Sequence, residues 1–151
     1  MSRMHSGKKG KSGSTRPYGR PMPKWIEQSK EEVEELVVKL AKTGMAPSVI
    51  GVALRDQYGV PNVKMVTNTG VTEILEEKGI KREIPEDLMN LLKKAVNLDH
   101  HRTQNRPDMV SKRGVQLVES KIRRLVKYYK REGKLPEDWK YNLAAAKLLV
   151  E

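Results

Sequence analysis

The sequence predicts an all-α protein, because three observations point the same way. Apolar residues recur at spacings of three and four along most of the chain. Neither an internal repeat nor strand-like alternation longer than four residues occurs. Gly and Pro residues separate the periodic segments. We therefore expect a basic arm over residues 1–24, a helical pair resembling a helix-turn-helix over 25–61, and a four-helix domain with two long antiparallel helices over 62–151.

Residues 1–24 form the predicted arm and contain mainly Gly, Ser, Pro and basic residues. This segment carries seven Lys or Arg residues and no acid. Because it has little apolar surface to bury, we expect it to stay disordered until a polyanion neutralises it. The candidate phosphate contacts in the arm are Arg3, Lys8, Lys9, Lys11, Arg16 and Arg20.

Two short helices are predicted to follow the arm. Ser29 and Glu32 have the spacing of a capping box, which predicts a helix over about residues 30–43. Pro47 occupies a favoured first-turn position for a second helix, and Gly59 ends it. Both helices have an apolar face, so this part of the chain should pack as a helix, a short turn and a helix.

A short helix and a long helix are predicted next. Residues 70–78 have a helical apolar pattern that Gly79 ends. Pro85 then begins a long helix whose pattern runs out near His101 and breaks before Pro107. The expected buried stripe of this long helix consists of Leu88, Leu91, Leu92, Ala95 and Leu98.

The last long helix is predicted over about residues 110–131, with a weak helix from about Leu143 after it. Five apolar residues spaced three and four apart predict its core stripe: Val115, Val118, Ile122, Leu125 and Tyr129. On the opposite face we expect Arg113, Ser120, Arg124, Lys127, Tyr128 and Arg131. Since no acid interrupts that face, the pattern favours contact with RNA over an ordinary solvated face.

Composition narrows the function. The net charge is +11, and residues 100–134 hold eleven basic residues against three acids. Two separated basic blocks are typical of a nucleic-acid-binding protein. The absence of cysteine excludes a disulfide scaffold, a thiolate zinc site and a cysteine nucleophile. His100 and His101 are adjacent, so on a helix they diverge by roughly 100° and cannot share one metal ion. We expect no cofactor, no metal and no enzymatic activity.

The stretch from Leu98 to Arg131 resembles the ribosomal protein S15 family of the small ribosomal subunit. The resemblance consists of His101, Asp108, Ser111-Lys112-Arg113-Gly114, Leu125 and Tyr128, all at the family's spacing. Residues 1–69 resemble the extension of archaeal members and of the eukaryotic counterpart, S13. Asn105 stands where bacterial members have a second His, and their Thr-Gly-Ser segment has no counterpart around residues 81–87.

This resemblance implies a cytoplasmic structural protein that binds the central domain of small-subunit RNA at a helical junction and a minor groove, and supports assembly and translation. It implies neighbouring ribosomal proteins as partners, a further contact with large-subunit RNA at an inter-subunit bridge, and no membrane or small-molecule substrate. The RNA-binding residues that it implies, together with the basic outer face, are His101, Asn105, Asp108, Ser111, Lys112, Arg113, Lys121, Arg124, Lys127, Tyr128 and Arg131.

Three alternatives stay open from the residues alone. The helical pair over 25–61 is compatible with a DNA-binding regulator, although its second helix carries only Arg55 as a basic residue. A small hydrolase is a further alternative function, but the sequence offers no combination of nucleophile, base and orienting group. Asp108 has a structural interpretation beside the functional one, as the N-cap of the last long helix.

Overall fold

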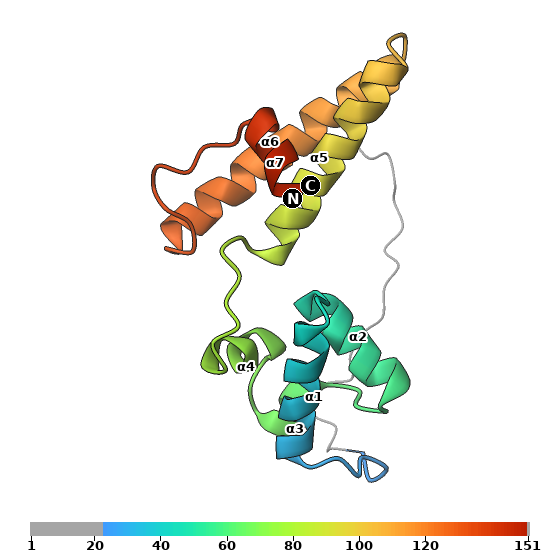
Figure 1. Ribbon diagram of the computed structural model, residues 1–151, viewed down its shortest axis with the longest axis vertical. Helices are drawn as coiled ribbons and strands as arrows, with labels where there is room; N and C mark the ends of the chain where they lie inside the picture. Colours follow the sequence, from blue (N-terminus) through green and yellow to red (C-terminus); the bar gives the residue numbers. More distant parts are fainter. Residues whose placement is uncertain (1–22, 151) are drawn as a thin grey trace. The chain divides into compact units, whose positions relative to one another are not determined.

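The computed structural model describes residues 23–150, and these are all-helical, with no strand among them. The described residues form two compact units, residues 23–81 and 82–150 (Figure 1). The helices are α1 (Lys30–Lys42), α2 (Pro47–Gln57), α3 (Val63–Thr67), α4 (Val71–Glu77), α5 (Glu86–Gln104), α6 (Met109–Arg131) and α7 (Leu143–Val150). None of these helices is long and apolar enough to cross a membrane. The candidate arm contacts Arg3, Lys8, Lys9, Lys11, Arg16 and Arg20 lie outside the described residues.

In the first unit, α1 packs against α2, α3 and α4. Its core contains fully buried apolar side chains from α1, α2 and α4, among them Val33, Val37, Ile50, Leu54 and Ile74. The predicted pair of helices over 25–61 is therefore present, and it shares one core with the short helices that follow. As the glycine pattern predicts, Gly44, Gly59 and Gly79 have positive φ values after α1, α2 and α4.

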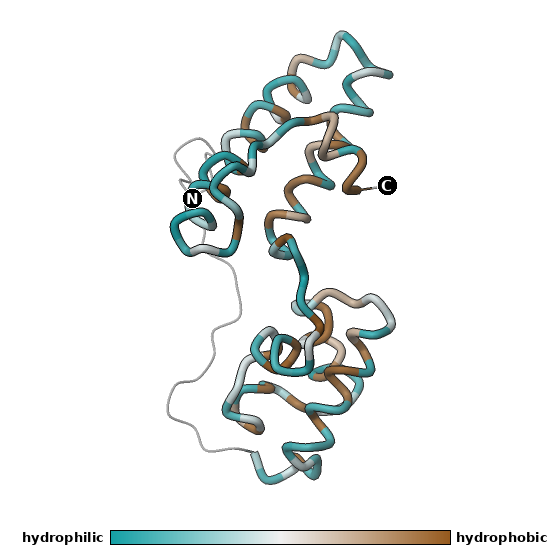
Figure 2. Tube along the Cα trace, turned by 60° about the vertical axis from the view of Figure 1, so that its left-hand side comes forward, coloured by the Kyte–Doolittle hydropathy of each residue, from teal (hydrophilic) through white to brown (hydrophobic). Residues whose placement is uncertain are grey.

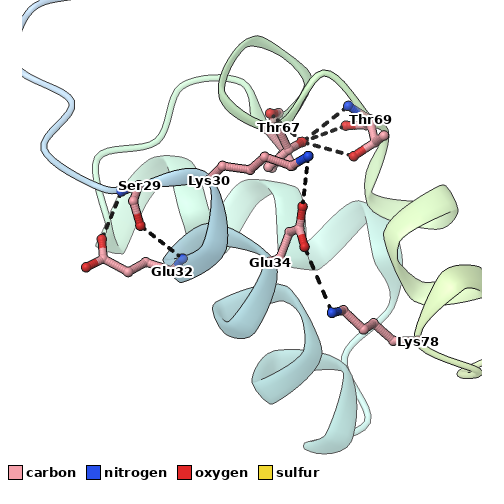
Figure 3. Close-up of polar contacts among 8 residues, drawn as sticks. Ser29, Lys30, Glu32, Glu34, Thr67, Thr69 and Lys78 are labelled. Atoms are coloured by element: carbon pink, nitrogen blue, oxygen red, sulfur yellow. Dashed lines mark hydrogen bonds and ion pairs between the residues drawn. The ribbon is translucent and has the colours of Figure 1, made fainter.

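Polar contacts fix the beginning and the middle of α1 (Figure 3). The Ser29 hydroxyl accepts a hydrogen bond from the Glu32 amide at 3.3 Å, and Glu32 accepts one from the Ser29 amide at 2.9 Å. This is the predicted capping box. One turn further on, the Glu34 carboxylate lies 3.7 Å from the Lys30 ammonium and 4.0 Å from that of Lys78. Glu34 thus links α1 to the end of α4.

The short helix α3 was not predicted, because its five residues span less than two turns and show no apolar period. The Asn62 side chain caps it by accepting a hydrogen bond from the Lys64 amide at 3.2 Å. Asn68 ends it in the left-handed region, with φ of 64°. Thr67 is fully buried, and its hydroxyl lies 3.1 Å from the Val63 carbonyl and 3.0 Å from the Thr69 carbonyl (Figure 3). The caps at its two ends therefore fix α3, and an apolar period does not.

The second unit is an antiparallel hairpin of α5 and α6, with α7 packed on α5. Figure 2 shows hydrophobic and hydrophilic positions alternating along the two long helices, while α7 is predominantly hydrophobic. At one end of the hairpin, the Tyr129 hydroxyl on α6 lies 2.7 Å from both carboxylate oxygens of Asp87 on α5. Burial and this hydrogen bond to Asp87 raise the pKa of Tyr129, which stays a neutral donor at any ordinary pH.

Two parts of the predicted core stripes need correction. On α6, Val126 is buried where Leu125 was expected, and Leu125 packs only partly against the core. On α5, Leu91 and Leu98 are half-buried, and the polar Asp99 is buried. On α5 the cause is α7, which covers a side of that helix that a two-helix pattern leaves open and brings Lys147 to Asp99.

Asp99 links α7 to α5 through charge. Its carboxylate accepts hydrogen bonds from the Lys147 ammonium at 2.8 Å and from the Arg102 guanidinium at 2.9 Å. The hydrogen bond from Lys147, with that cation's charge and Arg102, holds the pKa of Asp99 below its usual range despite burial. A buried carboxylate with two cationic partners is stable, whereas one that loses a partner is not.

We predict that Lys147→Met destabilises the second unit by about 1–3 kcal/mol, because Asp99 keeps only Arg102 as a partner. The pKa of Asp99 is lower in the folded state than in the unfolded state. The stability that its ion pairs contribute is therefore fully present above the unfolded-state pKa, and it is lost as pH falls through the folded-state pKa. Urea unfolding at neutral pH measures the loss, and Lys140→Met at an exposed lysine is the control. Equal stabilities for both variants would contradict the prediction.

Candidate nucleic-acid interface

Four of the predicted site residues meet at the turn between α5 and α6. His101 lies in the last turns of α5, Asn105 is its C-cap, Asp108 is the N-cap of α6, and Ser111 lies in the first turn of α6. We call these four residues the tip cluster. The helical hairpin brings them together because it reverses the chain between Gln104 and Met109.

Asp108 is the centre of the tip cluster. One carboxylate oxygen accepts a hydrogen bond from the Ser111 amide at 3.0 Å, which caps α6. The other accepts the Ser111 hydroxyl at 2.5 Å and faces His101 Nε2 at 3.1 Å. The Ser111 hydroxyl, the Ser111 amide and His101 together lower the pKa of Asp108 to about 2. The N-cap interpretation is therefore confirmed, and Asp108 also organises its neighbours.

The hydrogen bonds also assign the donors within the tip cluster. Because the ionised Asp108 carboxylate can only accept, His101 Nε2 must carry the proton. In the neutral ring, Nδ1 is then an acceptor, and the Asn105 side-chain amide lies 3.4 Å from it. The same amide donates to the His101 carbonyl at 3.1 Å. A carboxylate has roughly four lone-pair positions, and at Asp108 they are shared among the Ser111 hydroxyl and amide, His101 and the Val110 amide.

The remaining predicted residues lie along α6 on its outer face. Arg113, Arg124, Lys127, Tyr128 and Arg131 are all exposed. The Arg131 guanidinium carbon lies 5.7 Å from the centre of the Tyr128 ring, and the Tyr128 and Tyr129 rings meet edge to face at 5.1 Å. Tyr128 is thus held between a core residue and a cation, with 45% of its surface open.

Two residues differ from the rest of this predicted set. Lys121 is half-buried, and its side chain belongs neither to the tip cluster nor to the centre of the outer face. Lys112 is exposed next to Ser111, on the tip side of α6. Between Ser111 and Tyr128 the helix rises by roughly 25 Å, at about 1.5 Å per residue. Because Arg113 lies only two residues from Ser111, the outer face begins beside the tip cluster and continues along α6 to Arg131.

Sequence reasoning missed the hydrogen-bond network that joins the four tip residues, since their spacing alone gives no partner. It also missed the exposure of Arg102, Arg106, Met109 and Val110 around the same turn. Among the described residues, no group of three or more His, Asp or Glu side chains could hold a metal ion.

Family models and known relatives match most of the chain. Residues 1–60 match the family model "Ribosomal S13/S15 N-terminal domain", and residues 71–149 match "Ribosomal protein S15". The chain is 52% identical over 151 residues to small ribosomal subunit protein uS15 of Methanococcus vannielii, and the match covers both chains completely. It is 54% identical over 143 residues to the protein of the same name from Hyperthermus butylicus, covering 95% of this chain and 89% of that one.

We predict that the Asp108 carboxyl titrates near pH 2 and that Ser111→Ala moves its pKa up toward the ordinary value of 3.8. Since the folded-state pKa is depressed, the capping stabilisation is present above the ordinary value and is lost as pH falls through about 2. Carbon-detected NMR of the Asp108 carboxyl measures both midpoints. Ser120→Ala is the matched control, because the Ser120 hydroxyl donates to the Gln116 carbonyl instead. An unchanged midpoint in Ser111→Ala would disprove the cause assigned here.

Proposed function

The chain belongs to the ribosomal protein S15 family, and we propose that it holds small-subunit ribosomal RNA by two surfaces, the tip cluster and the outer face of α6. As a member of that family it is a structural constituent of the small ribosomal subunit, binds ribosomal RNA and is not an enzyme. It works in translation in the cytoplasm, with small-subunit RNA and neighbouring ribosomal proteins as partners. This assignment decides against the DNA-binding regulator and the hydrolase.

The observation that carries the tip cluster's role is that hydrogen bonds hold His101, Asp108 and Ser111 together at one partly exposed turn. The minor groove of A-form RNA is wide and shallow and displays 2′-hydroxyls and base edges. Hydrogen-bond donors in that groove include the 2′-hydroxyl and the guanine amino group. Asp108 and the lone pairs of the Ser111 hydroxyl accept such donors, and Asn105 adds an exposed amide oxygen. We assign minor-groove recognition to this cluster.

The outer face of α6 is our proposed contact with the helical junction. Arg113, Arg124, Lys127 and Arg131 supply charge for phosphates, which positions the protein without reading sequence. Tyr128 supplies an aromatic ring with a cation beside it, a surface on which an unstacked junction base can lie. Lys112 and Lys121 contribute further positive charge on either side. The roughly 25 Å from Ser111 to Tyr128 allows α6 to contact RNA at the tip cluster and again near its C-terminal end.

The division of the chain follows from these assignments. We propose residues 62–151 as the RNA-binding domain, residues 25–61 as its extension, and residues 1–24 as an arm that contacts phosphates through its basic residues. A contact with large-subunit RNA at an inter-subunit bridge is a further proposal, supported by the family resemblance. Cross-linking in assembled ribosomes tests the bridge, and the absence of any large-subunit cross-link would count against it.

We predict that His101→Ala and Asp108→Asn each lower the preference for the cognate RNA junction over a generic duplex by about 1–3 kcal/mol. Asn caps a helix as well as Asp does, so Asp108→Asn removes the charge and keeps the fold. Lys127→Ala, at an exposed cation of the outer face, should weaken binding to both RNAs about equally. Filter binding with the two RNAs gives the ratio, and equal losses in all three variants would contradict the tip assignment.

Deleting residues 1–24 is expected to lower RNA affinity and to make its salt dependence shallower, because each lost phosphate contact removes about 0.7–0.9 from the log–log slope. Helical content should be unchanged, since α1 begins at Lys30. A matched control keeps the arm's length but replaces its Lys and Arg residues with Gln, and it should behave like the deletion. Circular dichroism and RNA titration measure both quantities. An unchanged salt slope would rule out the arm's phosphate contacts.

A further inference from the structure

Two apolar side chains are exposed at the turn between α5 and α6. Met109 and Val110 are the first two residues of α6, and they are 66% and 83% exposed. In the part of the chain that the structure describes, no large apolar side chain is more exposed than Val110. The turn lies at one end of the hairpin, beyond the part that α7 covers (Figure 1).

The fold does not account for apolar residues at these positions. Neither side chain belongs to the core of the second unit. The first turn of a helix favours acids, because they interact well with its dipole. The first turn of α6 contains none, as is also the case in α2, α3 and α7, whereas α1 and α5 each have two. Since Asp108 already caps this helix, Met109 and Val110 are not needed to begin it.

The charges around the pair indicate what covers it. Arg102, Arg106, Lys112 and Arg113 are exposed within a few residues of it, and Arg102 also pairs with the buried Asp99. The acid beside the pair, Asp108, has its charge shared among three hydrogen bonds from Ser111 and His101. An exposed apolar pair with several exposed cations close to it in sequence complements a polyanion with apolar patches, and the sugars of RNA provide such patches between phosphates.

We propose that Met109 and Val110 are RNA contacts that pack against ribose faces in the minor groove, beside the nucleotides bound by the tip cluster. This proposal rests on the proposed function of that cluster. Packing there removes water from the hydrogen bonds at Asp108 and Ser111, which strengthens them. It also selects for groove shape, because the B-form DNA minor groove, about 6 Å wide, is too narrow to admit a helical turn.

The test compares the full-length protein with the double variant Met109→Gln, Val110→Thr. These substitutions keep side-chain length and branching while adding polar atoms. The probe is a transcribed three-helix junction from the central domain of small-subunit RNA, titrated at several salt concentrations. We expect the Kd to rise about tenfold with an unchanged salt slope, because no ionic contact is lost. Leu148→Gln, at an exposed apolar residue of α7, should leave the Kd unchanged.

The outcomes separate this inference from the function on which it rests. If the wild-type protein fails to bind the fragment, the proposed function is wrong and this inference falls with it. If the wild type binds and the double variant binds equally well, only the inference is wrong. A weaker Kd accompanied by a shallower salt slope would also overturn it. Circular dichroism of the variant checks that α6 is retained.

Discussion

The apolar seam between α5 and α6 is the contact on which both proposed RNA surfaces depend. Leu88, Leu92, Val118 and Ile122 are buried along it, and the bond between Tyr129 and Asp87 closes one end. With one side of α6 fixed against α5, its opposite side must face solvent, and that side carries the basic outer face. The other end of the same seam holds the turn, so the packing that buries the core also brings the tip cluster together.

The hydrogen bonds of Asp108 serve both a structural role and the proposed binding role. Its carboxylate caps α6 through the Ser111 amide, and the same charge orients the His101 ring and the Ser111 hydroxyl. The low pKa of Asp108, about 2, means that this acceptor is ionised wherever the protein functions. The side chains are therefore positioned before RNA arrives, which reduces the ordering cost of binding.

Sequence reasoning succeeded where a pattern extends over several turns. The long helices, the glycine ends of α1, α2 and α4, and the capping box at Ser29 are all predicted by periodicity or by a short motif. It failed where tertiary contacts decide. The burial of Asp99 depends on Lys147, which is distant in sequence. The helix α3 was missed for another reason, because it is too short for an apolar period and is fixed by local caps at Asn62 and Asn68. The tip residues were identified by resemblance, whereas the bonds between them required the structure.

The packing of α4 bears on how the chain divides into parts. The match to the S15 model begins at residue 71, the start of α4, yet Ile74 and Leu75 of this helix are buried in the core with Val33 and Ile50 of the first unit. A chain cut between residues 61 and 62 would expose that apolar face, at roughly 1.5–3 kcal/mol for each large side chain. The hairpin core contains no residue of α4 and would be unaffected. The energetic boundary therefore lies between residues 81 and 82, so an RNA-binding domain over residues 62–151 must either leave α4 exposed or find a new surface to cover it.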